Sequence, residues 1–344
     1  MALFLASDYI EHQIEPLPDI YISNQPKTLG NPSGTSCNGR TSSNVLTPEE
    51  ASEYCDHYCL KPADHDLVRK RKVFDVLLIN TEVEMLEVHL GQMAPYGDYF
   101  VILEFDKTLT DHWELFKPWH DKIILRTIHL EELKEDGIAW NHETKSRNAL
   151  YQQVFPTLVG EQAAATDDVL IVADVDEIPK PEIVRASRNC NIPPRVTTHA
   201  RIYYYSFQWL SRGDWWHSQA NLYRGSDTVL PEDLRKNANN HHLFHDGWHC
   251  SYCFSTVEEL TRKITLFSHT EMDKPEYMDP DWVVDVTQRG LDIFGRDSSN
   301  FVRMEHYRDV PDYVRNNLDS FKFLLDCDPP NGNYRDYTPK SKPA

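Results

Sequence analysis

An apolar run that breaks abruptly into carboxylates constrains this chain more than any other feature. Val169 to Ala173 has the β-branched, uninterrupted apolar character of a central strand that is covered on both faces. Pro179 and Pro181 prevent that strand from continuing much further. The acids expected just past its carboxyl end are Asp174, Asp176 and Glu177.

Carboxylates at this edge of an α/β sheet indicate a ligand site. Ligand crevices form at the carboxyl ends of parallel strands, and clustered carboxylates repel one another unless a cation neutralises them. A hard divalent ion with oxygen ligands fits such a cluster, so Asp174 and Asp176 are predicted to bind Mn²⁺ or Mg²⁺. The ion would keep coordination positions free for substrate phosphates. The alternative interpretation is a solvated acidic turn.

The composition limits the possible partners. The chain has 344 residues and a formal charge of -19, which argues against a nucleic-acid backbone or an anionic membrane surface as partner. A nucleotide diphosphate can still bind if a metal supplies positive charge. No window approaches the roughly 20 apolar residues of a membrane span, and Met1 to Ala6 is too short for a signal-peptide core. We therefore expect no membrane span and no nucleic-acid partner.

Three segments follow from the distribution of residue types. Residues 1–70 are rich in Pro, Ser, Asn and Gly and are predicted to be a loop-rich extension, residues 71–328 to be one main domain, and residues 329–344 to be a flexible tail. Strands alternate with helices from Lys72 onward, which predicts an α/β fold with a mostly parallel sheet flanked by helices. The predicted strands are 73–79, 98–104, 122–128, 169–173 and 200–207, and the predicted helices are 83–93, 141–155, 256–268, 280–291 and 311–325.

Seven cysteines leave at least one thiol unpaired. Cys250 and Cys253 have the C-x-x-C spacing and lie near His249, so a zinc site is one interpretation. The chain has no second C-x-x-C pair, which favours a disulfide or two buried thiols instead.

Polar residues on neighbouring predicted elements could complete a nucleotide site. Arg147 and Asn148 lie on the predicted helix before the acidic strand, where a guanidinium could pair with phosphate, although an exposed helix arginine is the simpler interpretation. Glu82 and Glu104 lie at or near strand ends and either contact the nucleotide or cap a turn. Arg296 follows Gly295 in a predicted loop and could close over a diphosphate.

Three tryptophans that lie next to histidines in the sequence are suited to bind a sugar. Trp215, Trp216 and Trp248 each lie within two positions of a histidine, and a flat apolar ring beside hydrogen-bonding groups matches a sugar ring with its fringe of hydroxyls. They are predicted to bind the acceptor. Packing in the core is the alternative for at least one of them.

The order of these motifs resembles glycosyltransferase family 17, the family of β-1,4-mannosyl-glycoprotein 4-β-N-acetylglucosaminyltransferase. The likeness covers about residues 71–325. It rests on Arg71-Lys-Val-Phe-Asp75, Asn80-x-Glu-x-Glu-Met-Leu-Glu87, Asp98-Tyr-Phe-Val-Ile-Leu-Glu104, the acidic strand from Asp167 to Pro179, Gly247-Trp-His249 and Gly295-Arg296.

This resemblance implies a GT-A-like fold, UDP-N-acetylglucosamine (UDP-GlcNAc) as donor, and Mn²⁺ held by the Asp-x-Asp carboxylates. It also implies inversion at the anomeric carbon and a glycan or glycoprotein acceptor, with β-1,4 transfer to a mannose of an N-glycan. By the same resemblance the chain is expected in the Golgi or the secretory-pathway lumen. The family's bisecting enzyme is anchored in the Golgi membrane, whereas this sequence shows no anchor, so a cytoplasmic location is the alternative.

An inverting transfer needs a base that deprotonates the acceptor hydroxyl. We predict Asp246 for this role, with His249 second, because both flank the Gly-Trp-His turn. Glu177 is predicted to support the ion or the donor sugar. Two other functions fit part of the pattern: a haloacid-dehalogenase-like phosphatase, which also uses a strand ending in Asp-x-Asp, and a carbohydrate-binding protein without catalysis.

Overall fold

The computed structural model describes residues 44–105, 111–128, 139–237, 239–244, 247–266, 274–296, 301–305 and 309–339. All of them belong to one compact unit, Arg40–Ala344.

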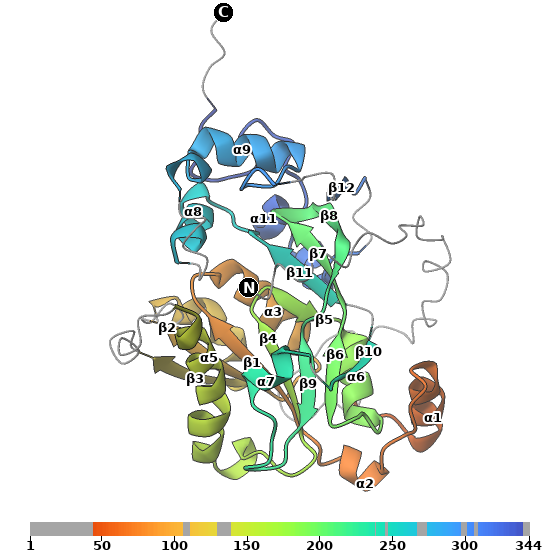
Figure 1. Ribbon diagram of the computed structural model, residues 1–344. Helices are drawn as coiled ribbons and strands as arrows, with labels where there is room; N and C mark the ends of the chain where they lie inside the picture. The colour runs from red at the N-terminus through yellow and green to blue at the C-terminus, as the bar shows by residue number, and fades with distance from the viewer. Residues whose placement is uncertain are drawn as a thin grey trace, which may run out of the picture. The chain divides into compact units, whose positions relative to one another are not determined.

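The main sheet has seven strands in the order β10-β6-β9-β4-β1-β2-β3 (Figure 1). The four strands on one side of it pair in parallel, and β9 runs antiparallel to both of its neighbours. This confirms the predicted α/β fold with a mostly parallel sheet. The strands are β1 (Val73–Ile79), β2 (Tyr99–Phe105), β3 (Ile123–Ile128), β4 (Val169–Asp174), β6 (Arg195–Thr198), β9 (Gln219–Leu222) and β10 (His241–Phe244).

Helices cover both faces of this sheet because successive strand residues point to opposite sides. In β1, Val73 and Leu77 pack with α3 (Val83–Met93) and α6 (Pro181–Asn189). Phe74 and Val76 point the other way, into a core that the segment after α5 and helix α7 complete. The elements of this second face are α5 (Ala139–Ala149), a short π-helix (Leu150–Val154) and α7 (Pro231–Arg235). Two-sided burial explains the continuous apolar character of β1 and β4.

A second sheet begins directly after the acidic residues. Its order is β12-β8-β7-β11-β5, and all of its pairings are antiparallel except that of β7 with β11. Glu177 belongs to the first of these strands along the chain, so the acids connect two sheets and do not end in a simple turn. The strands are β5 (Glu177–Pro179), β7 (Ala200–Tyr204), β8 (Ser206–Trp215), β11 (Gly247–Ser251) and β12 (Phe301–Arg303).

The C-terminal helices pack with this second sheet. Helix α8 (Val257–Leu266) and α9 (Pro280–Arg289) share an apolar cluster with Tyr205 and Trp209. The predicted helix 311–325 is broken into α10 (Asp312–Asn316), α11 (Leu318–Phe321) and a short 3-10 turn. The break falls at Asn317, whose φ of -130° and ψ of 48° are not helical.

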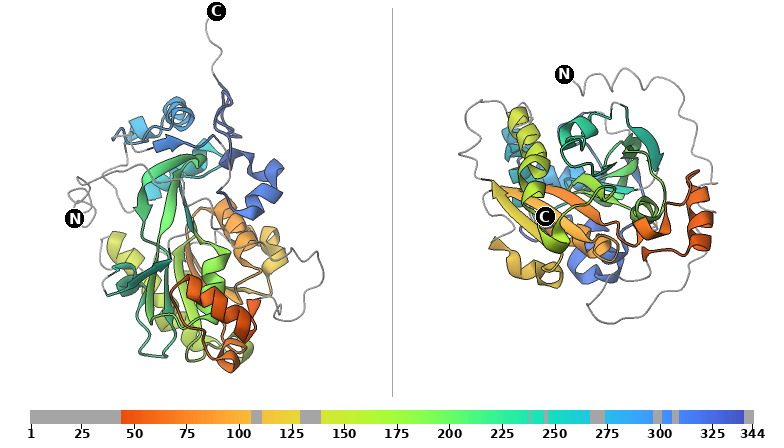
Figure 2. Two further views of the ribbon diagram at one scale, coloured as in Figure 1. Left: turned by 90° about the vertical axis from the view of Figure 1, so that its right-hand side faces the viewer. Right: turned by 90° about the horizontal axis from the view of Figure 1, so that it is seen from below.

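Both ends of the described chain are more ordered than the sequence predicts. The segment 44–70, predicted as part of a loop-rich extension, contains α1 (Pro48–His57) and α2 (His65–Val68). A disulfide between Cys55 and Cys190 ties α1 to the end of α6, and the two helices lie side by side (Figure 2). In the predicted tail, Asp336 accepts hydrogen bonds from the first backbone N–H groups of α8.

Cys250 and Cys253 form a disulfide, which is one of the two alternatives that the sequence favours over a zinc site. Cys59 and Cys327 are free thiols, the first exposed and the second buried.

Candidate active site

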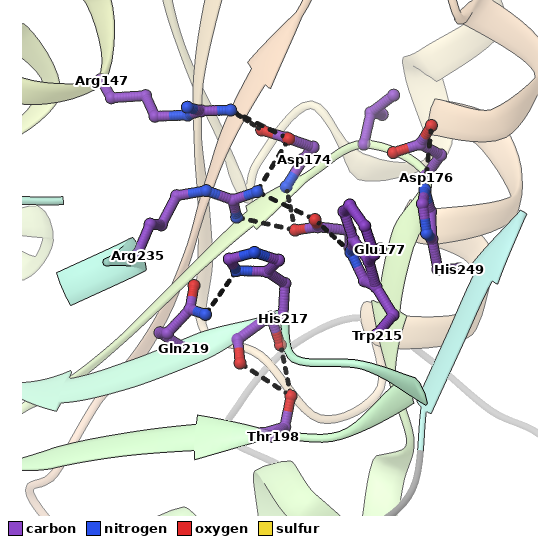
Figure 3. Close-up of polar contacts among 12 residues, drawn as sticks. Arg147, Asp174, Asp176, Glu177, Thr198, Trp215, His217, Gln219, Arg235 and His249 are labelled. Atoms are coloured by element: carbon purple, nitrogen blue, oxygen red, sulfur yellow. Dashed lines mark hydrogen bonds and ion pairs between the residues drawn. The ribbon is translucent and has the colours of Figure 1, made fainter. Parts of the chain in front are cut away.

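The first acid, Asp174, lies at the end of β4 between two arginines (Figure 3). Arg147 Nη2 lies 3.1 and 3.0 Å from the two carboxylate oxygens, and Arg235 Nη2 lies 3.0 Å from one of them. Burial raises the pKa of Asp174, but the two guanidinium groups lower it further, and the net shift is downward. The structure thus gives the predicted metal ligand Asp174 two arginine partners.

Glu177 is the most buried acid of the group, with 1% of its side chain exposed. Arg235 from α7 donates to both of its carboxylate oxygens at 2.8 and 2.9 Å, and Trp215 Nε1 donates at 2.7 Å. The same carboxylate accepts the backbone N–H of Asp174 at 2.8 Å. Burial raises the pKa of Glu177, but Arg235 lowers it more strongly, so the carboxylate stays ionised. Through these contacts Glu177 positions the acidic loop and Arg235.

Asp176 faces a different cation. Lys263 Nζ from α8 lies 2.8 Å from Asp176 and 3.0 Å from Glu82, and His249 Nε2 lies 3.7 Å from Asp176. Burial raises the pKa of Asp176, but Lys263 lowers it more strongly, and the net pKa lies well below the ordinary value. Conversely, burial lowers the pKa of Lys263 while Asp176 and Glu82 raise it above its ordinary range.

The donor set at Asp176 suits a divalent ion in part. Oxygens of Asp176 and Glu82 converge on one cation position, which Lys263 Nζ fills. Carboxylate oxygens are the ligands that Mn²⁺ and Mg²⁺ prefer. Within the described residues, no group of three or more His, Cys, Asp or Glu side chains is arranged for a metal. The protein would thus supply two ligands, and phosphates and water the others.

A buried histidine supports the acidic loop from beneath. His89 of α3 is fully buried, and its Nδ1 lies 3.0 Å from the carbonyl of Val175, between the two aspartates. A carbonyl only accepts, so Nδ1 carries a proton and donates. Nε2 lies 2.9 Å from Asp75 of β1. Burial alone lowers the pKa of His89, but Asp75 raises it, and the net shift is upward. Asp75 and His89 therefore fix the backbone at the middle of Asp-x-Asp.

Gly247 allows the Gly-Trp-His strand to lie against the acidic strand. A Cβ at this position would lie 3.2 Å from the Cβ of Ala200 and 3.3 Å from the carbonyl oxygen of Ile178. A larger side chain would push β11 away from β5, and with it His249 from its place beside Asp176.

The three predicted acceptor tryptophans have different environments. Trp215 stacks on His249 at 4.4 Å between ring centroids and holds Glu177. Trp216 is 48% exposed and stacks on His199, so its ring is accessible to a sugar. Trp248 is buried and donates to Asp309, as the alternative of packing in the core expects, and its contact with an acceptor stays a prediction.

The remaining predicted residues contact other groups. Asn148 accepts a hydrogen bond from Glu232 N in the first turn of α7, so it helps to place the helix that carries Arg235. Glu104 is buried and accepts from Thr127. Arg296 donates from Nε to Oδ1 and from Nη2 to Oδ2 of Asp292 in its own loop, which is a bidentate pair. Asp246, the predicted base, lies outside the described residues.

Two cations of the site are not apparent from the sequence. Arg235 ends a helix of five residues, and the apolar pattern around it is too short to show which way it points. Lys263 lies three residues after Leu260 and one before Ile264, both buried, and this place at the margin of an apolar stripe is its only signal.

The protonation of His217 makes the free energy of unfolding depend on pH. Burial and the nearby Arg235 lower its pKa from 6.5 to about 4. In the unfolded chain His217 binds a proton below about pH 6.5, whereas in the folded chain it binds one only below about pH 4. The contribution of His217 is therefore complete above pH 6.5 and decreases as the pH falls through this window, by at most about 1.4 kcal/mol per pH unit.

Replacing His217 by asparagine should flatten the dependence of the free energy of unfolding on pH between about 6.5 and 4. Denaturant unfolding at several pH values measures it. The exposed His241→Asn is the matched control and should keep the wild-type slope. A wild-type slope in His217→Asn would contradict the neutral state of this partly buried imidazole.

Comparison with known families defines the class of protein: the chain is a glycosyltransferase. Residues 47–331, most of the chain, match the profile of glycosyltransferase family 17, and the chain belongs to that family. The predicted resemblance is thereby confirmed. The match begins at Thr47, the N-cap residue of α1, which lies upstream of the predicted domain boundary at residue 71.

No curated protein matches the chain. Among solved structures, 4-diphosphocytidyl-2C-methyl-D-erythritol synthase from Anaerococcus prevotii is similar at 10% identity, covering 61% of this chain and 99% of that chain. The TM-score of this pair is 0.33. In the part of the chain that the structure describes, no helix has the length and apolar character needed to span a membrane.

Proposed function

We propose that this glycosyltransferase moves N-acetylglucosamine from UDP-GlcNAc to a glycan with inversion, forming a β-1,4 linkage to a mannose of an N-glycan. The observation that carries the proposal is the gathering of Arg147, Arg235 and Lys263 around carboxylates at the end of β4. Largely buried cations at the carboxyl ends of parallel strands suit the diphosphate of a nucleotide sugar.

Each charged group has a proposed task. Arg147 and Arg235 bind diphosphate oxygens, since guanidinium groups match phosphate geometry, and Asp174 and Glu177 orient them. Asp176 and Glu82 hold Mn²⁺ or Mg²⁺, which would neutralise the charge that develops on the leaving UDP. The general base is proposed to be Asp246 or His249, the second of which lies beside Asp176.

The acceptor is proposed to lie against Trp216. Its exposed ring follows Trp215 in the chain, and Trp215 contacts both Glu177 and His249. An acceptor sugar stacked on Trp216 would thus lie near the donor groups.

We also propose that the chain works in the Golgi or another part of the secretory pathway. Two disulfides, Cys55–Cys190 and Cys250–Cys253, support an oxidising compartment because cytosolic reductants keep most thiols reduced.

A panel of UDP-sugars tests the donor. With Mn²⁺ and an N-glycan acceptor, we expect UDP release from UDP-GlcNAc to exceed release from UDP-galactose and UDP-glucose by at least about tenfold, and chelation of the metal to abolish it. Faster release from another sugar would overturn the donor assignment. Hydrolysis of simple phosphomonoesters would support the phosphatase alternative, which membership of family 17 disfavours. Glycan binding without turnover would support the carbohydrate-binding alternative.

A further inference from the structure

Lys263 occupies a position where its ammonium contacts two carboxylates at once. Its Nζ lies 2.8 Å from Asp176 Oδ2 and 3.0 Å from Glu82 Oε1. All three side chains are at most 15% exposed, so water screens the charges only weakly. One positive charge thus stands between two negative charges, as a bound cation would.

The surroundings anchor the carboxylate of Glu82 and the helix that carries Lys263. The other oxygen of Glu82 accepts the backbone N–H of Thr81 at 2.9 Å. Helix α8, which carries Lys263, begins with a hydrogen-bonded pair of Thr256 and Glu259 side chains and is capped further by Asp336. The stem of Lys263 therefore starts from a well-anchored helix, while its ammonium is on a flexible chain that can move.

A divalent ion and the ammonium compete for the same oxygens. An ion held by Asp176 and Glu82 would need the space that Lys263 Nζ fills, and the two cations would repel each other. Lys263 must therefore leave when the ion binds, and a buried ammonium needs another anionic partner. A diphosphate on the same metal offers that partner.

Resting on the proposed function, we propose that Lys263 is a resident cation that keeps Asp176 and Glu82 closed to metal until a nucleotide diphosphate arrives. The ammonium of Lys263 would then pair with the diphosphate, and Asp176 and Glu82 would bind the ion. Metal and nucleotide consequently bind as a pair, each strengthening the other by the same factor.

Titration of Mn²⁺, followed by the electron paramagnetic resonance signal of the free ion, tests this without an activity assay. In the wild type, UDP should tighten Mn²⁺ binding by about 10- to 100-fold. Lys263→Met should bind Mn²⁺ about tenfold more tightly than wild type in the absence of UDP and should show a smaller gain when UDP is added. The control Arg262→Met removes an exposed positive charge from the neighbouring position of α8 and should behave as wild type.

A second variant covers the case in which Lys263→Met folds poorly. Glu82→Gln keeps the shape of the side chain and the Lys263–Asp176 pair, and it should weaken Mn²⁺ binding in the presence of UDP by about tenfold. The inference is wrong if Glu82→Gln binds UDP and keeps the wild-type affinity for Mn²⁺. It is also wrong if Lys263→Met binds UDP and has the wild-type affinity for Mn²⁺ both with and without UDP. Absence of UDP binding in the wild type would instead overturn the proposed function, and this inference with it.

Discussion

Replacing Arg235 by methionine is expected to lower the free energy of unfolding by about 3–5 kcal/mol, because it leaves a buried charge without its partner. Only 8% of the Arg235 side chain is exposed, and it donates to both oxygens of Glu177 and to Asp174. Methionine fills much of the same volume but cannot neutralise Glu177. Denaturant unfolding at neutral pH, where both acids are ionised, measures the loss.

Two further variants isolate the cause. Lys236→Met, on the next residue, removes a charge whose pair with Asp233 is exposed, and it should cost less than about 1 kcal/mol. Adding Glu177→Gln to Arg235→Met removes the unpaired charge and should restore part of the lost stability. If Arg235→Met is as stable as Lys236→Met, the buried network does not hold the acidic loop.

Asp176→Asn is expected to lower the rate of sugar transfer by at least about 10²- to 10³-fold with little change in folding. Asparagine has nearly the same shape, so Lys263 keeps Glu82 and one amide oxygen as partners. The lost charge is the one proposed to hold the metal beside the leaving UDP. Steady-state UDP release at saturating donor measures the effect.

The control for this prediction is Asp233→Asn, which removes an exposed carboxylate from α7 and should leave the rate unchanged. A rate in Asp176→Asn within a few-fold of wild type would remove Asp176 from the catalytic machinery.

The sequence predicts the central strands well because their burial on both faces leaves a strong apolar signal. The pattern predicts a strand over 73–79 and a helix over 83–93, and the structure has β1 and α3 with those bounds. Local chemistry also predicts the carboxyl-end position of Asp174. Short elements are harder to predict, since no strand is predicted where β10 and β11 lie.

The partners of the acids could not be predicted because they come from distant parts of the chain. Arg235 and Lys263 reach the acidic loop from α7 and α8, 58 and 87 residues away in sequence. Their positions depend on how the second sheet packs, and no local pattern encodes that. The role of Asp75 is similar: its carboxylate is buried against His89, which supports the backbone of the acidic loop, and no local pattern shows this contact.

Formation of the glycosylated product tests the central claim most directly. Purified protein would be incubated with UDP-GlcNAc, Mn²⁺ and a defined N-glycan, and the glycan analysed by mass spectrometry with linkage determination. We predict the gain of one N-acetylhexosamine in β-1,4 linkage to mannose, and no gain with Asp176→Asn. A glycan that stays unmodified across the donor panel, with a folded and disulfide-bonded protein, would contradict the account.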